Sequence, residues 1–167
     1  MKKIITKERA LERLESLCGR SEQCEFEINR KLINWGISLS DRREIIASLI
    51  ENKYLDNSRY ARSFTNDKAK FSSWGPYKIK MELLKRHIES KYIVQALEGI
   101  NPLIWKEGLL KSAKAKLRNI DLIEEEVLKN KQKILRYLLN RGYSLSSSSK
   151  VIEMLMRQKK DNDEEMA

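Results

Sequence analysis

Leu32-Ile33-Asn34-Trp35-Gly36-Ile37 is the first of three similar stretches in this chain; Leu83-Leu84-Lys85-Arg86-His87-Ile88 and Leu138-Leu139-Asn140-Arg141-Gly142-Tyr143 are the others. In each, two apolar residues precede two mostly polar ones, then a Gly or His, then another apolar residue. This order is typical of a helix that ends in a left-handed residue, where glycine avoids the steric cost of a Cβ and the next apolar residue folds back onto the last turn. The three stretches therefore predict the ends of three equivalent helices.

The spacing of these stretches predicts how the rest of the chain is organised. They begin 51 and 55 residues apart, a period that fits three helices per repeat. Apolar residues recur at helical spacing almost throughout, and strand-like alternation is absent over any useful length. We expect an all-α fold of about nine helices in three tandem three-helix repeats, elongated or curved. The expected repeats are residues 1–55, 56–100 and 101–157, followed by a frayed tail over residues 158–167.

Helix-capping residues support these boundaries. Ser40 or Asp41 is expected to cap the third helix, and Asp56 the fourth. Asn101 before Pro102 pairs a capping side chain with a proline at the first helical position, where its missing N–H costs nothing. The expected starts of two further helices are Gly75-Pro76 and the serine run Ser146-Ser147-Ser148-Ser149.

The composition excludes several classes of protein. No stretch approaches the roughly 20 apolar residues that a membrane-spanning helix needs, and the basic start lacks the apolar region of a signal peptide. Cys18 and Cys24 are expected to be reduced, partly buried thiols of a cytoplasmic protein. We expect neither a membrane partner nor a small-molecule substrate.

No reaction chemistry is visible in the sequence. The only histidine, His87, occupies a helix-end position and lacks an obvious acidic or cysteine partner, which makes it a poor general base. The two cysteines do not have the spacing of a zinc site, and no glycine-rich phosphate loop is present. The run Glu124-Glu125-Glu126 is more simply explained by the helix dipole than by a metal. We expect a non-enzyme without cofactor or metal.

Positive charge is the strongest functional signal. The formal net charge is +10, which favours polyanionic partners. Residues 56–91 hold nine Lys/Arg and four Asp/Glu, residues 106–118 five and one, and residues 129–141 five and none. The first thirty residues are nearly balanced, with seven bases and six acids. The excess therefore lies in the second and third repeats.

Helical spacing places several of these bases on common faces. Lys111, Lys114 and Arg118 fall at i, i+3 and i+7, and Lys129, Lys133 and Arg136 at i, i+4 and i+7. Arg59, Arg62 and Lys70 form a third row. Any one such face can be merely solvated, but three faces poor in acids favour sequence-independent, salt-sensitive contact with phosphates. The tryptophans could stack on bases, although packing is the simpler role for Trp35, Trp74 and Trp105.

Two longer motifs resemble a known family. The stretch Tyr54-Leu55-Asp56-Asn57-Ser58-Arg59-Tyr60-Ala61-Arg62-Ser63-Phe64 is similar to the Y-L-D-D-x-R-F-A-x-x-F signature of the RecX family. The stretch Gly75-Pro76-Tyr77-Lys78-Ile79-Lys80-Met81-Glu82-Leu83-Leu84-Lys85-Arg86-His87-Ile88 resembles that family's G-P-x-R-I-x-x-E-L-x-x-K-G-I. Asn57 replaces the second Asp, Lys78 replaces Arg, and His87 replaces Gly, so that His87 must be left-handed or its helix must end differently.

The resemblance implies a small cytoplasmic modulator of the RecA recombinase, built of three-helix repeats, that lodges in the groove of the RecA–DNA filament. There it would restrain ATP hydrolysis, strand exchange and the co-protease role of the filament in recombination, DNA repair and the SOS response. Apolar residues of the motifs are most simply core, Asp56 a cap and Gly75-Pro76 a turn. The contact candidates are Arg59, Arg62, Lys70, Lys78, Lys80, Lys85, Arg86, Lys111, Lys114, Arg118, Lys129, Lys133 and Arg136.

Two other readings stay open. The chain could be a free-standing helical protein that binds single- or double-stranded DNA weakly and without sequence preference. No helix concentrates the Arg, Asn and Gln needed to read base edges, so sequence-specific binding is not expected. The chain could also be a helical scaffold whose charge serves only solubility.

Overall fold

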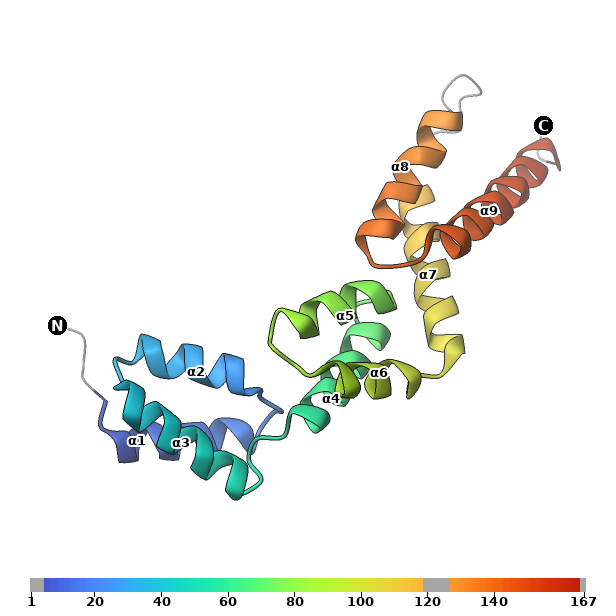
Figure 1. The fold of residues 1–167 in the computed structure, drawn as a ribbon. Helices are drawn as coiled ribbons and strands as arrows, with labels where there is room; N and C mark the ends of the chain where they lie inside the picture. The colour runs from blue at the N-terminus through green and yellow to red at the C-terminus, as the bar shows by residue number, and fades with distance from the viewer. Residues whose placement is uncertain (1–4, 119–126, 166–167) are drawn as a thin grey trace. The chain divides into compact units, whose positions relative to one another are not determined.

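The computed structural model describes residues 5–118 and 127–165. Over these residues the chain forms nine helices and no strand, which confirms the predicted all-α fold of three-helix repeats (Figure 1). The helices are α1 (Lys7–Cys18), α2 (Glu25–Asn34), α3 (Leu39–Glu51), α4 (Asn57–Lys70), α5 (Pro76–Leu84), α6 (Ser90–Glu98), α7 (Pro102–Leu117), α8 (Val127–Asn140) and α9 (Leu145–Glu165).

The three related stretches end α2, α5 and α8 in the same way. Gly36, His87 and Gly142 all have a left-handed backbone, with φ of 78°, 57° and 88°. The N–H of the following residue reaches back to the first apolar residue of each stretch: Ile37 to the Leu32 carbonyl at 3.1 Å, Ile88 to Leu83 at 3.1 Å, and Tyr143 to Leu138 at 3.2 Å. The repeated helix end is confirmed, and His87 keeps the left-handed conformation without a glycine.

Most of the expected caps hold, and two are corrected. The Asp56 carboxylate accepts from the Arg59 N–H at 2.9 Å, and Asn101 accepts from the Leu103 N–H at 2.9 Å. The α3 cap is Ser38, which accepts from the Asp41 N–H, so the expectation of Ser40 or Asp41 was wrong by two or three residues. Ser144 accepts from the Ser147 N–H and caps α9, so the cap also precedes the expected run Ser146–Ser149. In both cases a leucine opens the helix directly after the capping serine.

By their contacts the helices fall into two compact units. The first unit is Met1–Phe64 with Leu83–Ala96, and the second is Thr65–Glu82 with Leu97–Ala167. The division into repeats at residues 55, 100 and 157 stays a proposal about the sequence repeat. The helix α9 continues to Glu165, through most of the segment expected to fray from residue 158.

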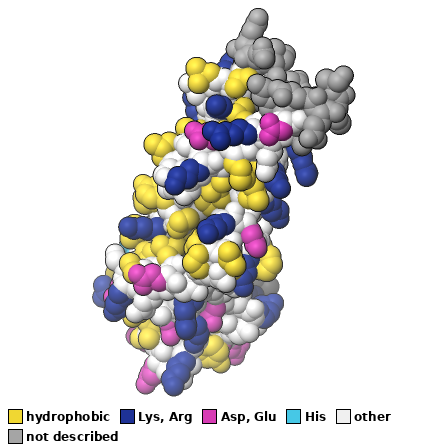
Figure 2. Space-filling view, turned by 90° about the vertical axis from the view of Figure 1, so that its right-hand side faces the viewer, with side chains coloured by type: hydrophobic (Ala, Val, Ile, Leu, Met, Phe, Trp, Pro, Cys, Tyr) yellow, Lys and Arg dark blue, Asp and Glu magenta, His cyan; other side chains and the backbone are white. Residues whose placement is uncertain are grey.

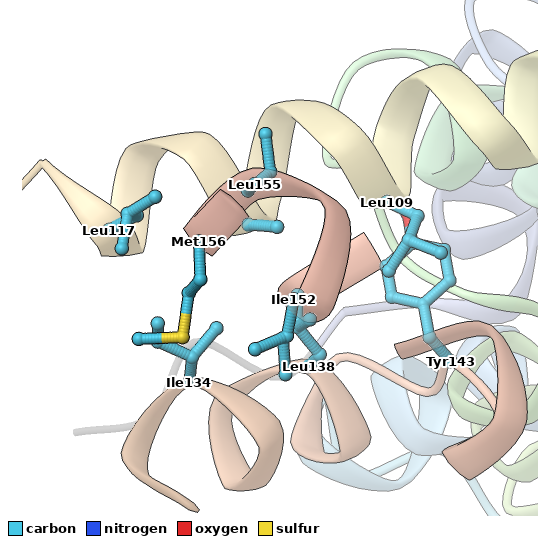
Figure 3. Packing of buried hydrophobic residues seen from close by; sticks show 9 residues of the cluster. Leu109, Leu117, Ile134, Leu138, Tyr143, Ile152, Leu155 and Met156 are labelled. Atoms are coloured by element: carbon cyan, nitrogen blue, oxygen red, sulfur yellow. The ribbon is translucent and has the colours of Figure 1, made fainter. Parts of the chain in front are cut away.

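Each unit has an apolar core formed by three helices. In the first unit, α1, α2 and α3 bury Ala10, Leu14, Ile28, Leu32, Ile45 and Leu49, and Trp35 packs against this cluster. In the second unit, α7, α8 and α9 bury Leu109, Ala113, Leu117, Ile134, Leu138, Tyr143, Ile152, Leu155 and Met156 (Figure 3). The apolar spacing of these helices turns one face of each toward the core, and the opposite faces carry the charge.

Candidate functional site

The thirteen basic candidates divide by exposure. Ten are exposed: Arg62, Lys70, Lys80, Lys85, Lys111, Lys114, Arg118, Lys129, Lys133 and Arg136. Three are half-buried: Arg59, Lys78 and Arg86. The second unit holds nine of the thirteen, all except Arg59, Arg62, Lys85 and Arg86. Most of the candidate cations therefore belong to the second unit.

The α7 row lies opposite the buried face of its helix. Lys111 and Lys114 are exposed, as is Arg118 at the C-cap, whereas Ala113 and Leu117 are buried in the second unit's core. Substituting the cations therefore leaves the core contacts of α7 intact. This face can contact an anionic partner without any rearrangement of the helix.

The α8 row has the same arrangement. Lys129, Lys133 and Arg136 are exposed, and Ile134 and Leu138 are buried. The Lys133 ammonium donates to the Asn130 side-chain carbonyl at 3.5 Å, a long bond that leaves the charge at the surface. Both cationic rows thus belong to one unit.

Two further lysines flank an aromatic ring in the second unit. The Nζ of Lys78 lies 4.4 Å from the ring centre of Trp74, and the Nζ of Lys68 lies 5.2 Å from it. At these distances the ring quadrupole attracts both cations. Trp74 is half-buried, and its ring contacts lysines of its own chain. Both observations agree with the packing role expected for it.

In the first unit, two of the candidate arginines are engaged by carboxylates. The Arg59 Nε donates to Glu22 at 2.7 Å, and its Nη2 donates to the Lys53 carbonyl at 3.1 Å. The Arg86 Nε donates to Glu27 at 3.0 Å. The hydrogen bond that Arg59 donates to Glu22 raises the pKa of Arg59. These pairs join the helix α2 region to the signature motif, which gives both arginines a structural role.

The Glu27 carboxylate also accepts from the Tyr60 hydroxyl at 3.2 Å. Burial raises the pKa of Tyr60 well above its ordinary value. Cys24, which lies directly before α2, is a free and fully buried thiol, and burial raises its pKa as well. Tyr60 and Cys24 are therefore both protonated at neutral pH, so the charges of this cluster are those of Arg86 and Glu27.

The lone histidine packs against an aromatic ring, and the possible metal ligands do not gather among the described residues. His87 lies just after the end of α5, and the centre of its ring is 5.2 Å from the ring centre of Phe26. Among the described residues no three His, Cys, Asp or Glu side chains come together as metal ligands would, and no described helix is long and apolar enough to cross a membrane. Glu124-Glu125-Glu126 lies outside the described residues.

A contact that the sequence did not predict joins residues about 70 positions apart in the second unit. The Tyr143 hydroxyl donates to the Ser73 carbonyl at 3.0 Å, and the Arg141 guanidinium donates to the carbonyls of Ser72 and Ser73. Arg141 was counted only as surface charge in the sequence. Its place in the third repeated stretch, at the position before the glycine, is the signal that could have marked it.

Figure 2 shows one face of the molecule with cationic side chains spread among apolar and uncharged ones. Acidic side chains are interspersed with them on this face, so the visible charge is scattered instead of gathered in one block. Recognition of a polyanion here would rest on several separate cations. Such contact neutralises phosphates without reading sequence.

The comparisons with known proteins agree on one family. Residues 56–97 match the model described as RecX, second three-helix domain. A protein of Clostridium acetobutylicum named Regulatory protein RecX is 30% identical over 152 residues, which cover 90% of this chain and 68% of that protein. A Clostridium botulinum protein of the same name is 29% identical, over 82% of this chain and 64% of that protein. The chain spans only 48% of a Lactococcus lactis protein of this name that is 28% identical to it.

Solved structures share the fold. A crystal structure of regulatory protein RecX superposes with a TM-score of 0.71 at 23% identity, covering 90% of this chain and 71% of that one. The crystal structure of RecX from Lactobacillus salivarius gives a TM-score of 0.68 at 21% identity, covering 89% of this chain and 96% of that one. Together with the repeated helix ends and the matched second domain, these relatives show that the chain belongs to the RecX family of regulatory proteins.

Proposed function

We propose that this chain is a non-enzymatic, cytoplasmic regulator that binds the filament of a RecA-type recombinase on DNA and restrains its ATPase, strand exchange and co-protease activity. The observation that carries the proposal is the family match over residues 56–97. This range contains the whole second signature motif and all of the first except Tyr54 and Leu55. The exposed basic rows of α7 and α8 support the proposal, because a filament presents a polyanion alongside protein.

Within this proposal the thirteen candidates have two roles. Arg59 and Arg86 hold the signature motif against Glu22 and Glu27, so their contribution is mainly structural. The exposed cations are the proposed contacts. The α7 and α8 rows are foremost among them, because all six residues of these two rows belong to one unit. Their binding to DNA alone is expected to be weak and independent of sequence.

The experiment that tests the function measures ATP turnover by the recombinase on single-stranded DNA while this protein is titrated. We expect turnover to fall in parallel with binding to the filament, measured by co-sedimentation at the same salt. Unchanged turnover at saturating binding would exclude the regulatory role. Equal binding to naked DNA and to the filament would instead favour a free-standing DNA-binding protein.

A further inference from the structure

The second unit contains an apolar pocket that the basic rows do not explain. Its volume is about 500 Å³, and it is lined by α7, α9, the segment before α9 and Pro76 at the start of α5. Its apolar walls include Leu109, Leu110, Val151 and Met154, and Trp105 also lines it. Figure 3 shows Leu109 and Tyr143, two of the pocket's lining residues, side by side at one end of the second unit's core.

The pocket combines apolar walls with positive charge and exposed apolar groups. Met154 is 42% exposed although it lines the pocket. Leu103 and Leu145, which lie close in sequence to lining residues, are 58% and 59% exposed. The charged lining residues are Lys106 and Lys150, both exposed, and none of the described lining residues carries a carboxylate. A partner that fits must therefore bring an apolar side chain and negative charge.

We propose that this pocket is a docking site for an acidic, amphipathic segment of the recombinase protein, separate from the cationic faces that contact DNA. An apolar side chain of that segment would enter between α7 and α9, while its flanking carboxylates would pair with Lys106 and Lys150. This is the helix-in-groove mode of recognition, in which apolar anchors give affinity and surrounding charges select the partner. The inference rests on the proposed function, because it names the protein contact within it.

The lining disfavours a nucleic-acid base as the occupant. The hydroxyl of Tyr143 is bonded to the Ser73 carbonyl, and its residue is only 6% exposed, so its ring offers no open stacking face. The Ser144 hydroxyl accepts from the Ser147 N–H and bonds the Ser147 hydroxyl at 3.0 Å. A base would leave most of its donors and acceptors against apolar walls, which is costly.

Met154→Glu tests the pocket, because it places a negative charge on the apolar wall at an already exposed position. Met81→Glu is the matched control, since Met81 is 38% exposed in the same unit and does not line the pocket. Met154→Leu preserves an apolar wall and should restore binding. Each variant is measured for filament binding, for binding to a naked oligothymidylate at the same salt, and for its thermal unfolding.

A second arm uses the wild-type protein labelled with 13C at its methionine methyl groups. The probe is a 15-residue helical peptide with leucines at i, i+4 and i+7 and glutamates elsewhere, and its control replaces the glutamates by lysines. We expect the Met154 methyl signal to shift with the acidic peptide and to shift much less with the basic one. This arm reports on the pocket without the recombinase, so its result is independent of the proposed function.

The proposal predicts that Met154→Glu weakens filament binding at least tenfold, leaves naked-DNA binding within twofold, and unfolds like Met81→Glu. Filament binding by Met154→Glu within twofold of wild type would overturn it. An equal loss on naked DNA would make the pocket a nucleotide site, and concentration-dependent self-association reversed by Met154→Glu would make it a contact between copies of this chain. If wild type binds no filament but the acidic peptide shifts Met154, the proposed function and the named partner fail while the pocket's preference for acidic segments stands.

Discussion

The backbone of Gly75 lies directly against the backbone of Gly142. A Cβ added to Gly75 would lie 2.4 Å from the carbonyl carbon and oxygen of Gly142, closer than any real side chain approaches. The Gly75 N–H donates to the Arg141 carbonyl at 2.7 Å, and the Tyr77 N–H donates to the Gly142 carbonyl at 3.1 Å. The start of α5 and the end of α8 are thus joined through two glycines, and this close approach explains the glycine at position 75 of the signature.

Three alanine substitutions separate backbone conformation from this contact. Gly36 and Gly142 are both left-handed, but a Cβ on Gly36 meets nothing within 4 Å, whereas one on Gly142 would lie 2.3 Å from the Lys78 nitrogen. We expect Gly36→Ala to lower the free energy of unfolding by about 1–2 kcal/mol. Gly142→Ala should lower the free energy of unfolding by a further ~1–3 kcal/mol, because its Cβ would also clash with the backbone of Lys78.

Gly75→Ala completes the set, because Gly75 is not among the residues of positive φ and its substitution therefore tests the contact alone. Urea unfolding followed by circular dichroism measures all three variants. Equal losses for Gly36→Ala and Gly142→Ala would mean that the close approach of Gly142 to Lys78 adds nothing to stability. A Gly75→Ala variant as stable as wild type would mean the same of the contact between Gly75 and Gly142.

The sequence predicted the repeats and the helix ends because these depend on local chemistry. A left-handed residue after an apolar pair is encoded within six residues, and the stretches around Gly36, His87 and Gly142 therefore revealed both period and topology. It did not predict the long-range partners of Arg59, Arg86 and Arg141, which lie 37 to 69 residues away in the sequence. Charge alone does not distinguish an arginine that pairs within the chain from one that faces a partner.

His87 holds a left-handed conformation that costs most residues free energy. We expect His87→Gly to raise the free energy of unfolding by up to about 1 kcal/mol, because glycine adopts φ of 57° without a Cβ clash. His87→Ala should be less stable than wild type, since it keeps the strain and removes the packing against the Phe26 ring. Thermal unfolding checks this order, in which His87→Gly is the most stable protein, wild type is next and His87→Ala is the least stable. A Gly variant less stable than the Ala variant would refute the strain argument.

Glu27 receives bonds from both Arg86 and Tyr60, and we expect Glu27→Gln to lower the free energy of unfolding by about 1–2 kcal/mol. The side chains of Arg86 and Glu27 are 23% and 31% exposed, so solvent screens the pair only in part. The control Lys80→Ala lies at an exposed position of the signature motif that contains Arg86. It should change the free energy of unfolding by less than about 0.5 kcal/mol. Chemical denaturation measures both; if they are equally stable, the Arg86–Glu27 pair contributes nothing to the fold.

Reversing the charge of Lys111, Lys114 and Arg118 together should weaken both DNA binding and inhibition of the recombinase ATPase. These three residues are exposed, so the variant should stay folded. The salt dependence of binding to single strands should become shallower by roughly 0.7 in log–log slope for each phosphate that the variant no longer neutralises.

The matched control for that variant reverses Arg9, Arg13 and Arg30, three exposed cations among the first thirty residues, where charge is nearly balanced. Anisotropy of a labelled oligonucleotide across a salt series and ATP turnover measure both proteins. If the two triple variants inhibit equally well, the α7 row is only a solvated face.

Tyr143 predicts how stability changes at alkaline pH. Burial raises its pKa to about 12 in the folded protein, against roughly 10 in the unfolded chain. The unfolded chain therefore loses this proton first, so the stabilisation from Tyr143 is complete below pH 10 and is lost as pH rises from 10 to 12. Tyr143→Phe removes this proton and the bond to Ser73, which should cost about 0.5–1.5 kcal/mol at pH 8. The stability gap between wild type and Tyr143→Phe should then narrow between pH 10 and 12.

The control is Tyr77→Phe, at a residue that is 64% exposed, and it should differ little in stability from wild type at any of the pH values measured. Urea unfolding at pH 8, 10 and 11.5 measures the gap, and a gap that stays constant across this range would show that the hydroxyl titrates alike in the folded and unfolded chains.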